Sequence, residues 1–266
     1  AVDGGYAISL PFFADLRLEQ IKLSYLFGKE RSNEGARRKR NAELRDVEPF
    51  TRCGTRIQVM MNAGLRDDMS ALAMTGADGV GLFRTEFQFL VSSTLPQRDR
   101  QMRLYRDVLD AAGDKPVVFR TVDIGGDKAV PYLDNAVAER DENPAMGWRA
   151  MRMALDRPGL IRYQLRALLR ASAGRELSIM FPLITTLAEF EASRELLDLE
   201  VARLAKFGRP GPERIKVGTM LEVPALVWQL DQLLPRIDFL SIGTNDLMQF
   251  FFAADPGNPM TGTRYD

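Results

Sequence analysis

Two arginines stand at the carboxyl ends of apolar runs that have the composition of buried β-strands. Arg84 directly follows the run GVGLF at 79–83, Arg120 lies near the end of the run VVFRTV at 117–122, and each is followed directly by a threonine. A buried arginine is costly unless an anion neutralises it. Because the guanidinium fork binds phosphate and carboxylate oxygens bidentately, two such arginines predict a pocket for a compact polyanion. The alternative is ion pairing within the chain, to Glu86 and Asp123.

Two further cations could join this pocket. Arg149 lies in the segment NPAMGWRAMRM, and Lys128 closes the segment DIGGDK. The pair Gly125 and Gly126 would allow a close backbone approach, and Lys128 would offer a charge to a phosphate. The segment matches neither G-x-G-x-x-G nor a Walker loop, so by itself it indicates only a turn after a strand.

Two carboxylates follow later apolar runs. Glu222 comes directly after IKVGTML, and Asp246 lies shortly after IDFLSI. Two carboxylates that are completed by water and substrate oxygens suit Mg²⁺ or Mn²⁺. The alternative is that Asp246 caps a helix N-terminus, a position that acidic residues favour. Arginines beside a divalent cation are the equipment of phosphoryl transfer, in which positioning and charge neutralisation provide most of the catalysis.

The composition narrows this chemistry. The chain has 266 residues, no histidine and a single cysteine, Cys53. Without histidine there is no Ser-His-Asp or Cys-His mechanism, no His-ligated metal and no phosphohistidine within the chain. One cysteine excludes an intrachain disulfide and a Cys-rich zinc site, which predicts a cytoplasmic protein.

The charge balance and the hydropathy argue against two classes of partner. Lys and Arg number 36, as do Asp and Glu, so the formal net charge is zero and nothing predicts binding to nucleic acid. The basic run at 37–40 is interpreted as part of a solvated helix, because acidic residues surround it. We expect no membrane span, since no apolar run reaches ~20 residues, and no signal peptide, since the first residues lack a basic region.

From residue 55 onward, short β-rich runs alternate with amphipathic stretches. Six runs predict strands, at 56–61, 79–83, 117–122, 177–183, 215–221 and 237–242. Four stretches predict helices, at 66–75, 98–112, 160–172 and 186–206. This alternation indicates parallel β-α units covered on both faces. Polar residues after almost every run favour a β/α barrel, whose strand ends converge on one mouth, over a doubly wound sheet. Since a complete barrel needs eight strands, the six units predict a truncated (β/α)8 barrel.

Six segments, in their order along the chain, resemble the phosphoenolpyruvate (PEP)-binding barrel of PEP-utilising enzymes. They are GADGVGLFRTEF, FRTVDIGGDK, NPAMGWRAMRMALDRP, IMFPLI, LEVPA and SIGTNDLMQF, and the resemblance as a whole covers roughly residues 37–258. The likeness is strongest to enzyme I of the bacterial phosphotransferase system, particularly its nitrogen-related paralogue. The resemblance implies a TIM-type barrel of the PEP/pyruvate-binding kind, preceded by a helical connector.

The resemblance also implies roles for the candidate residues. Asn245 would contact the phosphate of PEP, and Mg²⁺ would be bound by Glu222 and Asp246. The predicted substrate-binding set is Arg84, Arg120, Lys128, Arg149, Asn245 and Asp246. In the family, PEP phosphorylates a histidine on a separate domain, and the phosphoryl group passes to a small histidine-bearing carrier protein. We therefore expect this chain to be inactive alone and, like the family, to form a homodimer through the barrel.

The chain departs from the family pattern in three ways. The phosphorylated histidine is absent, and the cysteine that acts as an acid in the family would lie beyond Asp266. Where the family has Asp-Arg-Gly-Asn, residues 255–258 place Pro256 at the arginine position, which removes a contact worth about 1.5–3 kcal/mol. Arg264 lies nearby in the sequence.

The expected organisation has three parts. Residues 1–30 have no assigned role, residues 31–54 form a basic helical linker, and residues 55–266 form the incomplete barrel. Six strands would leave two unpaired edges, which promote association. Two alternatives stay open: the barrel of a dikinase or PEP synthase, and a non-catalytic PEP-sensing module, for which Pro256 is the main support.

Overall fold

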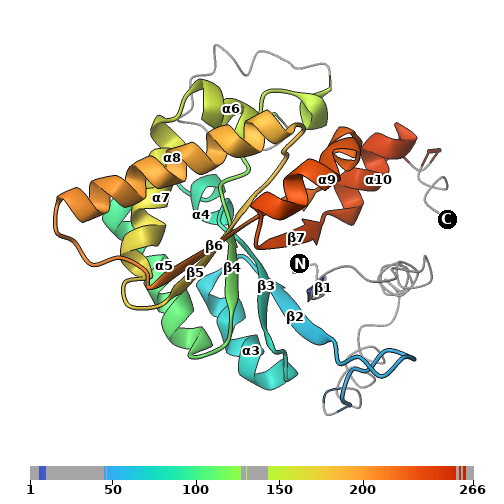
Figure 1. The fold of residues 1–266 in the computed structure, drawn as a ribbon, viewed down its shortest axis with the longest axis horizontal. Coiled ribbons are helices and arrows are strands. Elements are labelled where there is room, and N and C mark those ends of the chain that lie inside the picture. Colours follow the sequence, from blue (N-terminus) through green and yellow to red (C-terminus); the bar gives the residue numbers. More distant parts are fainter. Residues whose placement is uncertain are drawn as a thin grey trace.

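Six parallel strands form a curved, open sheet that resembles part of a barrel (Figure 1). The computed structural model describes residues 6–9, 45, 47–126, 130, 143–255, 258, 260 and 261. In chain order and in sheet order, the parallel strands are β2 Gln58–Ala63, β3 Gly79–Arg84, β4 Val117–Arg120, β5 Glu176–Phe181, β6 Arg214–Leu221 and β7 Phe239–Ile242. The predicted α/β fold with six parallel strands is therefore confirmed.

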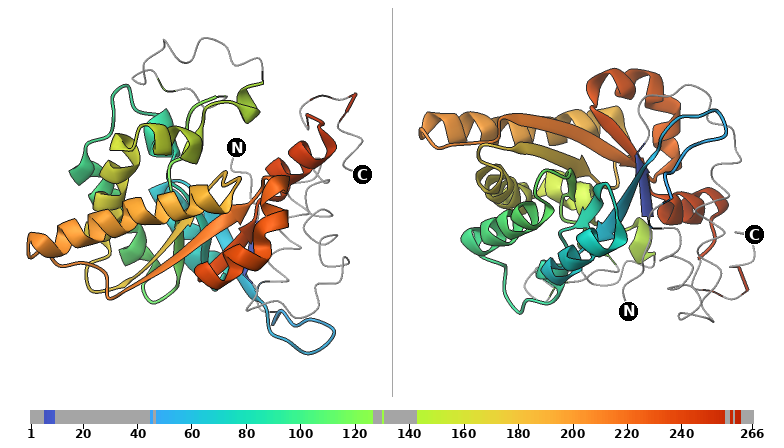
Figure 2. Two further views of the ribbon diagram at one scale, coloured as in Figure 1. Left: turned by 45° about the horizontal axis from the view of Figure 1, so that its top comes forward. Right: turned by 90° about the horizontal axis from the view of Figure 1, so that it is seen from below.

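Helices between these strands cover the convex face of the sheet (Figures 1 and 2). They are α3 Ser70–Thr75, α4 Phe87–Leu90, α5 Arg98–Ala112, α6 Ala150–Asp156, α7 Gly159–Ala171, α8 Leu187–Lys206 and α9 Leu230–Leu233, and a further helix, α10 Thr244–Phe252, follows the last strand. Four 3-10 turns add η1 Arg66–Met69, η2 Pro144–Met146, η3 Pro224–Gln229 and η4 Leu234–Arg236. Helix α7 packs between α5 and α8, so the outer layer follows the chain order.

Local signals explain where the predicted helices begin and end. Helix α8 starts with a capping box, in which the Thr186 hydroxyl accepts the N–H of Glu189 and the Glu189 carboxylate accepts the N–H of Thr186. Gly76, with φ +71°, ends α3 in the left-handed region. The predicted helix 66–75 has the same outer bounds in the structure, where a 3-10 first turn, η1, continues directly into α3.

The main core lies between the sheet and the outer helices, and it fixes the direction in which each strand side chain points. Phe83 and Phe119 are fully buried in this core and meet edge to face, with ring centroids 5.5 Å apart. Successive side chains of a strand point to opposite faces. The next residues, Arg84 and Arg120, therefore point to the concave face at the carboxyl ends of β3 and β4.

A seventh strand, which the sequence analysis did not predict, changes one edge of the sheet. Strand β1, Tyr6–Ser9, pairs antiparallel with β2 and lies within the stretch that had no assigned role. Four residues are too few to show a period. The expectation that the first parallel strand leaves an open edge is wrong, because β2 is paired on both sides and the edges of the sheet are β1 and β7.

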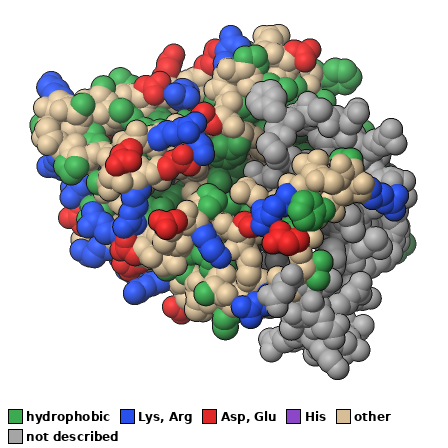
Figure 3. Space-filling view, turned by 60° about the horizontal axis from the view of Figure 1, so that its bottom comes forward, with side chains coloured by type: hydrophobic (Ala, Val, Ile, Leu, Met, Phe, Trp, Pro, Cys, Tyr) green, Lys and Arg blue, Asp and Glu red, His purple; other side chains and the backbone are tan. Residues whose placement is uncertain are grey.

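Several predictions fall on residues outside the described part of the chain. These are the basic run at 37–40, Lys128, Pro256 and Arg264. The domain boundaries also stay predictions. Among the described residues, no helix is long and apolar enough to cross a membrane. On the face seen in Figure 3, acidic and basic side chains of the described residues lie close to one another.

Candidate functional site

Arg84 and Arg120 occupy neighbouring positions at the mouth of the sheet. The register of β3 and β4 pairs them directly, and Met180 of β5 continues the row. Arg84 is half-buried, and its guanidinium lies 6.0 Å from the ring centroid of Phe87. It makes no hydrogen bond or ion pair with the described residues. Its charge is therefore available to a ligand.

Arg120 is more deeply buried and is neutralised within the chain. Its Nη2 contacts Glu86 Oε1 and lies 3.3 Å from Asp123 Oδ2. Burial lowers the pKa of Arg120, but the nearby carboxylates of Glu86, Asp123 and Glu222 outweigh it and hold that pKa above its ordinary value. Arg120 Nε and Glu86 Oε2 are buried without a hydrogen-bond partner among the described residues. Such unsatisfied atoms are uncommon in native structures, and they leave donor and acceptor capacity at the site.

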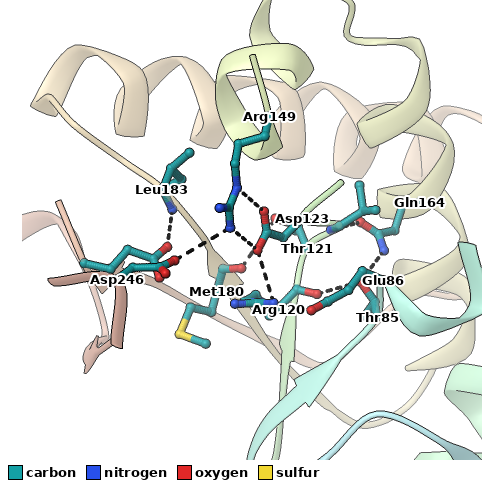
Figure 4. Close-up of polar contacts among 12 residues, drawn as sticks. Thr85, Glu86, Arg120, Thr121, Asp123, Arg149, Gln164, Met180, Leu183 and Asp246 are labelled. Carbon is teal, nitrogen blue, oxygen red and sulfur yellow. Dashed lines mark hydrogen bonds and ion pairs between the residues drawn. The ribbon is translucent and has the colours of Figure 1, made fainter. Parts of the chain in front are cut away.

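Arg149 joins the same cluster from the segment before α6 (Figure 4). Its Nε lies 3.1 Å from Asp123 Oδ1, and its Nη2 lies 2.9 Å from Asp123 Oδ2. The same Nη2 lies 3.6 Å from Asp246 Oδ2. Arg149 is only 3% exposed, so this bidentate pair forms away from bulk water. Asp123 thus holds Arg149 and also contacts Arg120.

The glycine pair after β4 positions Arg149. Gly125 forms a bridge with Arg149, and a Cβ at Gly125 would lie 2.5 Å from the Trp148 carbonyl oxygen. A Cβ at Gly126 would lie 2.1 Å from the carbonyl oxygen of Pro144. Both glycines have positive φ. The close approach that the sequence predicted is therefore to the chain's own segment 144–149.

Glu222 is buried directly after β6. Its Oε1 accepts the N–H of Leu183 at 2.6 Å, whereas its Oε2 makes no hydrogen bond with the described residues. Leu183 adopts φ +55°, a left-handed conformation that is rare for leucine and aims this N–H at the carboxylate. Burial, reinforced by the charges of Asp246 and Asp123, raises the pKa of Glu222 to about 7, although Arg120 and the Leu183 N–H oppose the rise.

Asp246 and Asn245 lie in the first turn of α10. The residue at the cap position is Gly243, so the alternative that Asp246 is the helix cap is wrong. The side chain of Asp246 faces Arg149 instead. Asn245 is exposed, and its side chain makes no hydrogen bond with the described residues.

The carboxylates of Glu222 and Asp246 fit a divalent cation whose remaining ligands are oxygens of water and of a bound substrate. The described residues contain no group of three or more acidic or cysteine side chains that could hold a metal ion. Glu222 and Asp246 instead provide two carboxylates, and Glu222 Oε2 has no hydrogen bond within the described part of the chain. Burial, together with the nearby carboxylates of Asp246 and Asp123, disfavours the negative charge of Glu222 and raises its pKa, and a bound cation would relieve this cost. Mg²⁺ commonly binds one or two carboxylates and completes its shell with water and substrate oxygens.

The threonine after each arginine has a structural role that the sequence analysis did not identify. Thr85 Oγ1 donates to the carbonyl oxygen of Arg120 at 2.8 Å, and Thr121 Oγ1 lies 3.5 Å from that of Met180. Each threonine thereby ties a strand end to the next strand, and the repeated Arg-Thr pair was the available signal. Two further contributors, Leu183 and Gln164, left no signal in the sequence.

The structure brings five of the predicted site residues to one mouth. They are Arg84, Arg120, Arg149, Glu222 and Asp246. The ion pairing that was the alternative for the arginines holds for Arg120 but not, within the described residues, for Arg84. The mouth therefore combines buried, preorganised arginines with one available arginine and a pair of carboxylates.

The family of this chain follows from its similarity to known proteins. The chain belongs to the PEP-utilising enzymes: residues 38–266 match the family described as "PEP-utilising enzyme, PEP-binding domain". Within this class, the chain is similar to PEP-protein phosphotransferases, with which its recognised motifs agree. The one from Lactococcus lactis is 42% identical over 226 residues, 84% of this chain and 39% of the relative.

Two other relatives carry the same name. The PEP-protein phosphotransferase of Staphylococcus carnosus is 43% identical over 213 residues, 80% of this chain and 37% of the relative. That of Geobacillus stearothermophilus is 41% identical over 239 residues, 90% of this chain and 41% of the relative. The chain thus spans about two-fifths of the length of these relatives. The likeness to the nitrogen-related paralogue stays a prediction.

Proposed function

We propose that this chain is the PEP-binding part of a PEP-protein phosphotransferase and that it binds PEP with Mg²⁺ at the mouth of the sheet. The observation that carries the proposal is the pairing of Arg84 with Arg120 beside Glu222 and Asp246. PEP has a phosphate and a carboxylate on a small skeleton, so it presents anionic oxygens to the arginines and to a cation at once.

The charge balance of the site supports a cation. Among the described residues, the site combines three arginines with four carboxylates: Arg84, Arg120 and Arg149 with Glu86, Asp123, Glu222 and Asp246. Within this described set the negative charges are in excess when all four carboxylates are ionised, which opposes the entry of a highly charged anion. A divalent cation on Glu222 and Asp246 would reverse that balance and, when bound, would neutralise charge on the transferring phosphoryl group. Mn²⁺ would serve similarly.

The residues of the chain would hold PEP rather than react with it. Arg84 would be the first cation to engage the ligand, since it has no competing carboxylate among the described residues. Arg120 and Arg149 would follow, already oriented by Asp123. Asn245 would contact the phosphate from the first turn of α10, and Lys128 would contribute a further charge. Positioning of this kind supplies much of the catalysis in phosphoryl transfer.

The acceptor of the phosphoryl group must lie outside this chain, which has no histidine. We infer that PEP phosphorylates a histidine on a separate domain, and that a small histidine-bearing carrier protein receives the group next. The isolated chain would then bind PEP without turnover.

We also propose that the six parallel strands are part of a complete (β/α)8 barrel in a homodimer. In such a barrel an eighth strand would pair with β2, on the edge that β1 occupies here. Closure would therefore require β1 to leave β2. Strand β7 offers the other edge.

Complementation tests the transfer. Adding the histidine domain and the remaining residues of the barrel should give pyruvate release from PEP, and it should require Mg²⁺. Arg84→Ala in the complemented protein is the matched control, and it should lose that activity. Normal PEP affinity without pyruvate release would instead support a PEP-sensing module.

A further inference from the structure

The side-chain amide of Gln164 joins three elements behind the mouth of the sheet. Gln164 lies on α7 and is fully buried. Its Oε1 accepts the N–H of Val122 at 2.8 Å, and its Nε2 donates to Thr85 Oγ1 at 2.8 Å and to the Tyr105 hydroxyl at 3.0 Å. Burying an amide among apolar side chains is costly unless it is hydrogen-bonded, and here both ends of the amide have partners.

Two of these bonds bracket Arg120. Val122 lies two residues after Arg120, where the chain has left the ladder of β4. On the other side, Thr85 receives a hydrogen bond from Gln164 and donates its own to the carbonyl oxygen of Arg120 at 2.8 Å. One amide thus restrains the segment 120–122 from both sides, directly at Val122 and through the hydroxyl of Thr85 at Arg120. Figure 4 shows Gln164, Thr85 and Arg120 in this arrangement.

The restrained segment contains one charged residue of the candidate site and adjoins another. Arg120 begins it, and Asp123, which holds Arg149, follows it directly. A displacement of Val122 would therefore move Arg120 and Asp123 together. In sites that act by positioning, a shift of about 1 Å is enough to reduce activity a hundredfold.

We propose that Gln164 is a positioning residue for PEP binding, acting on Arg120 and Asp123 through Val122 and Thr85 without touching the ligand. The proposal rests on the proposed function. Gln164 shares no hydrogen bond with Glu222 or Asp246 in the described part of the chain, so its influence falls on the arginine side of the site.

The test compares Gln164→Met with Gln101→Met. Methionine keeps the length of glutamine but removes its amide. Gln101 is also fully buried. Its Nε2 donates to the Pro96 carbonyl oxygen at 2.8 Å, and its Oε1 accepts from the Tyr105 hydroxyl. Among the described residues, its amide makes no hydrogen bond to β4 or to the segment after β4. The two variants therefore remove equally buried amides of the same hydrogen-bonded network.

Calorimetric titration of PEP with Mg²⁺ gives the first readout. We expect Gln164→Met to weaken binding 10- to 50-fold and Gln101→Met to change it less than twofold. Thr85→Val should weaken PEP binding as Gln164→Met does, whereas Thr85→Ser, which keeps the hydroxyl, should bind PEP like the wild type. A loss below twofold in Gln164→Met, or an equal loss in Gln101→Met, would overturn the positioning role.

A second readout requires no PEP and separates this proposal from the proposed function. The Nε–H resonance of Arg120 and the amide resonance of Val122 report the segment directly in NMR spectra of the chain. Gln164→Met should shift both, whereas Gln101→Met should leave both in place. If the wild-type chain binds no PEP, the proposed function fails. The spectra still show whether loss of the Gln164 amide displaces Arg120 and Val122. Unchanged resonances in Gln164→Met would contradict the inference.

Discussion

Arg84 and Arg120 are direct register partners at the ends of β3 and β4, yet the described carboxylates neutralise only Arg120. The two arginines therefore contribute differently although they share one face of the sheet. Arg120 belongs to a buried ion-pair cluster that supports the local structure. Arg84 keeps its charge for a ligand.

We predict that Arg84→Ala weakens PEP binding with little effect on stability. A charge-assisted hydrogen bond to phosphate is worth about 1.5–3 kcal/mol, which corresponds to a 10- to 100-fold weaker dissociation constant. Because Arg84 has no ion pair to lose within the described residues, the free energy of unfolding should change by less than about 0.5 kcal/mol. Titration of PEP and denaturant unfolding of the same variant check both values.

Arg120→Ala should behave in the opposite way with respect to stability. The substitution removes the partner of Glu86 Oε1, while Glu86 Oε2 already lacks a hydrogen bond among the described residues, so the buried carboxylate loses its neutralising charge. It also removes one of the two arginines that contact Asp123. Loss of one partner from a buried ion pair costs about 3–5 kcal/mol. Denaturant unfolding should show a loss of this order, together with loss of PEP binding. A variant as stable as Arg84→Ala would disprove the ion-pair cluster.

The pH dependence of stability should report Glu222. Burial, with Asp246 and Asp123 nearby, raises the pKa of this carboxyl to about 7 from an ordinary 4.5. Between these two pH values the folded chain holds a proton that the unfolded chain has released. The contribution of the Glu222 proton to the free energy of unfolding is therefore fully present below pH 4.5 and is lost as the pH rises through 7.

Comparison of the wild-type chain with Glu222→Gln isolates this effect. Without metal, the wild type should lose stability relative to the variant on going from low to neutral pH, by an amount on the order of 3 kcal/mol. Saturating Mg²⁺ should abolish that loss in the wild type only, since the variant lacks the carboxylate that would bind the cation. Parallel pH profiles for the two proteins would show that Glu222 has no raised pKa.

Gly243→Ala should damage the proposed metal site without unfolding the chain. A Cβ at Gly243 would lie 2.8 Å from Glu222 Oε2 and 2.9 Å from Met220 Sδ, so the Glu222 carboxylate would have to move. We expect the Mg²⁺ dependence of PEP binding to fall at least tenfold, with a stability cost of about 1–3 kcal/mol. Gly159→Ala is the matched control, because a Cβ there meets nothing within 4 Å.

Sequence periodicity was sufficient for the parallel part of the fold. The predicted helix 98–112 has the same bounds in the structure, and the predicted helix 160–172 is displaced by one residue from α7. Long amphipathic helices can be recognised from the sequence because burial of one face gives a regular hydrophobic period. Strand β1 did not, since its pairing with β2 is a tertiary contact of a four-residue segment.

The candidate site could be predicted in its charged residues but not in the groups that position them. Arg120, Glu222 and Asp246 each stand at or just after the end of an apolar run, which marks the mouth of a β/α barrel. Gln164 stands in the middle of a helix and Leu183 acts through its backbone N–H. Neither role follows from residue type or spacing, because both depend on how distant elements pack together.

The most direct test of the central claim is calorimetric titration of PEP into this chain, with and without Mg²⁺, for the wild type and for Arg84→Ala. The site at the mouth of the sheet predicts binding that requires Mg²⁺ in the wild type and is 10- to 100-fold weaker in Arg84→Ala. Absence of binding, or binding that neither Mg²⁺ nor this substitution changes, would contradict a PEP site at the mouth of β3 and β4.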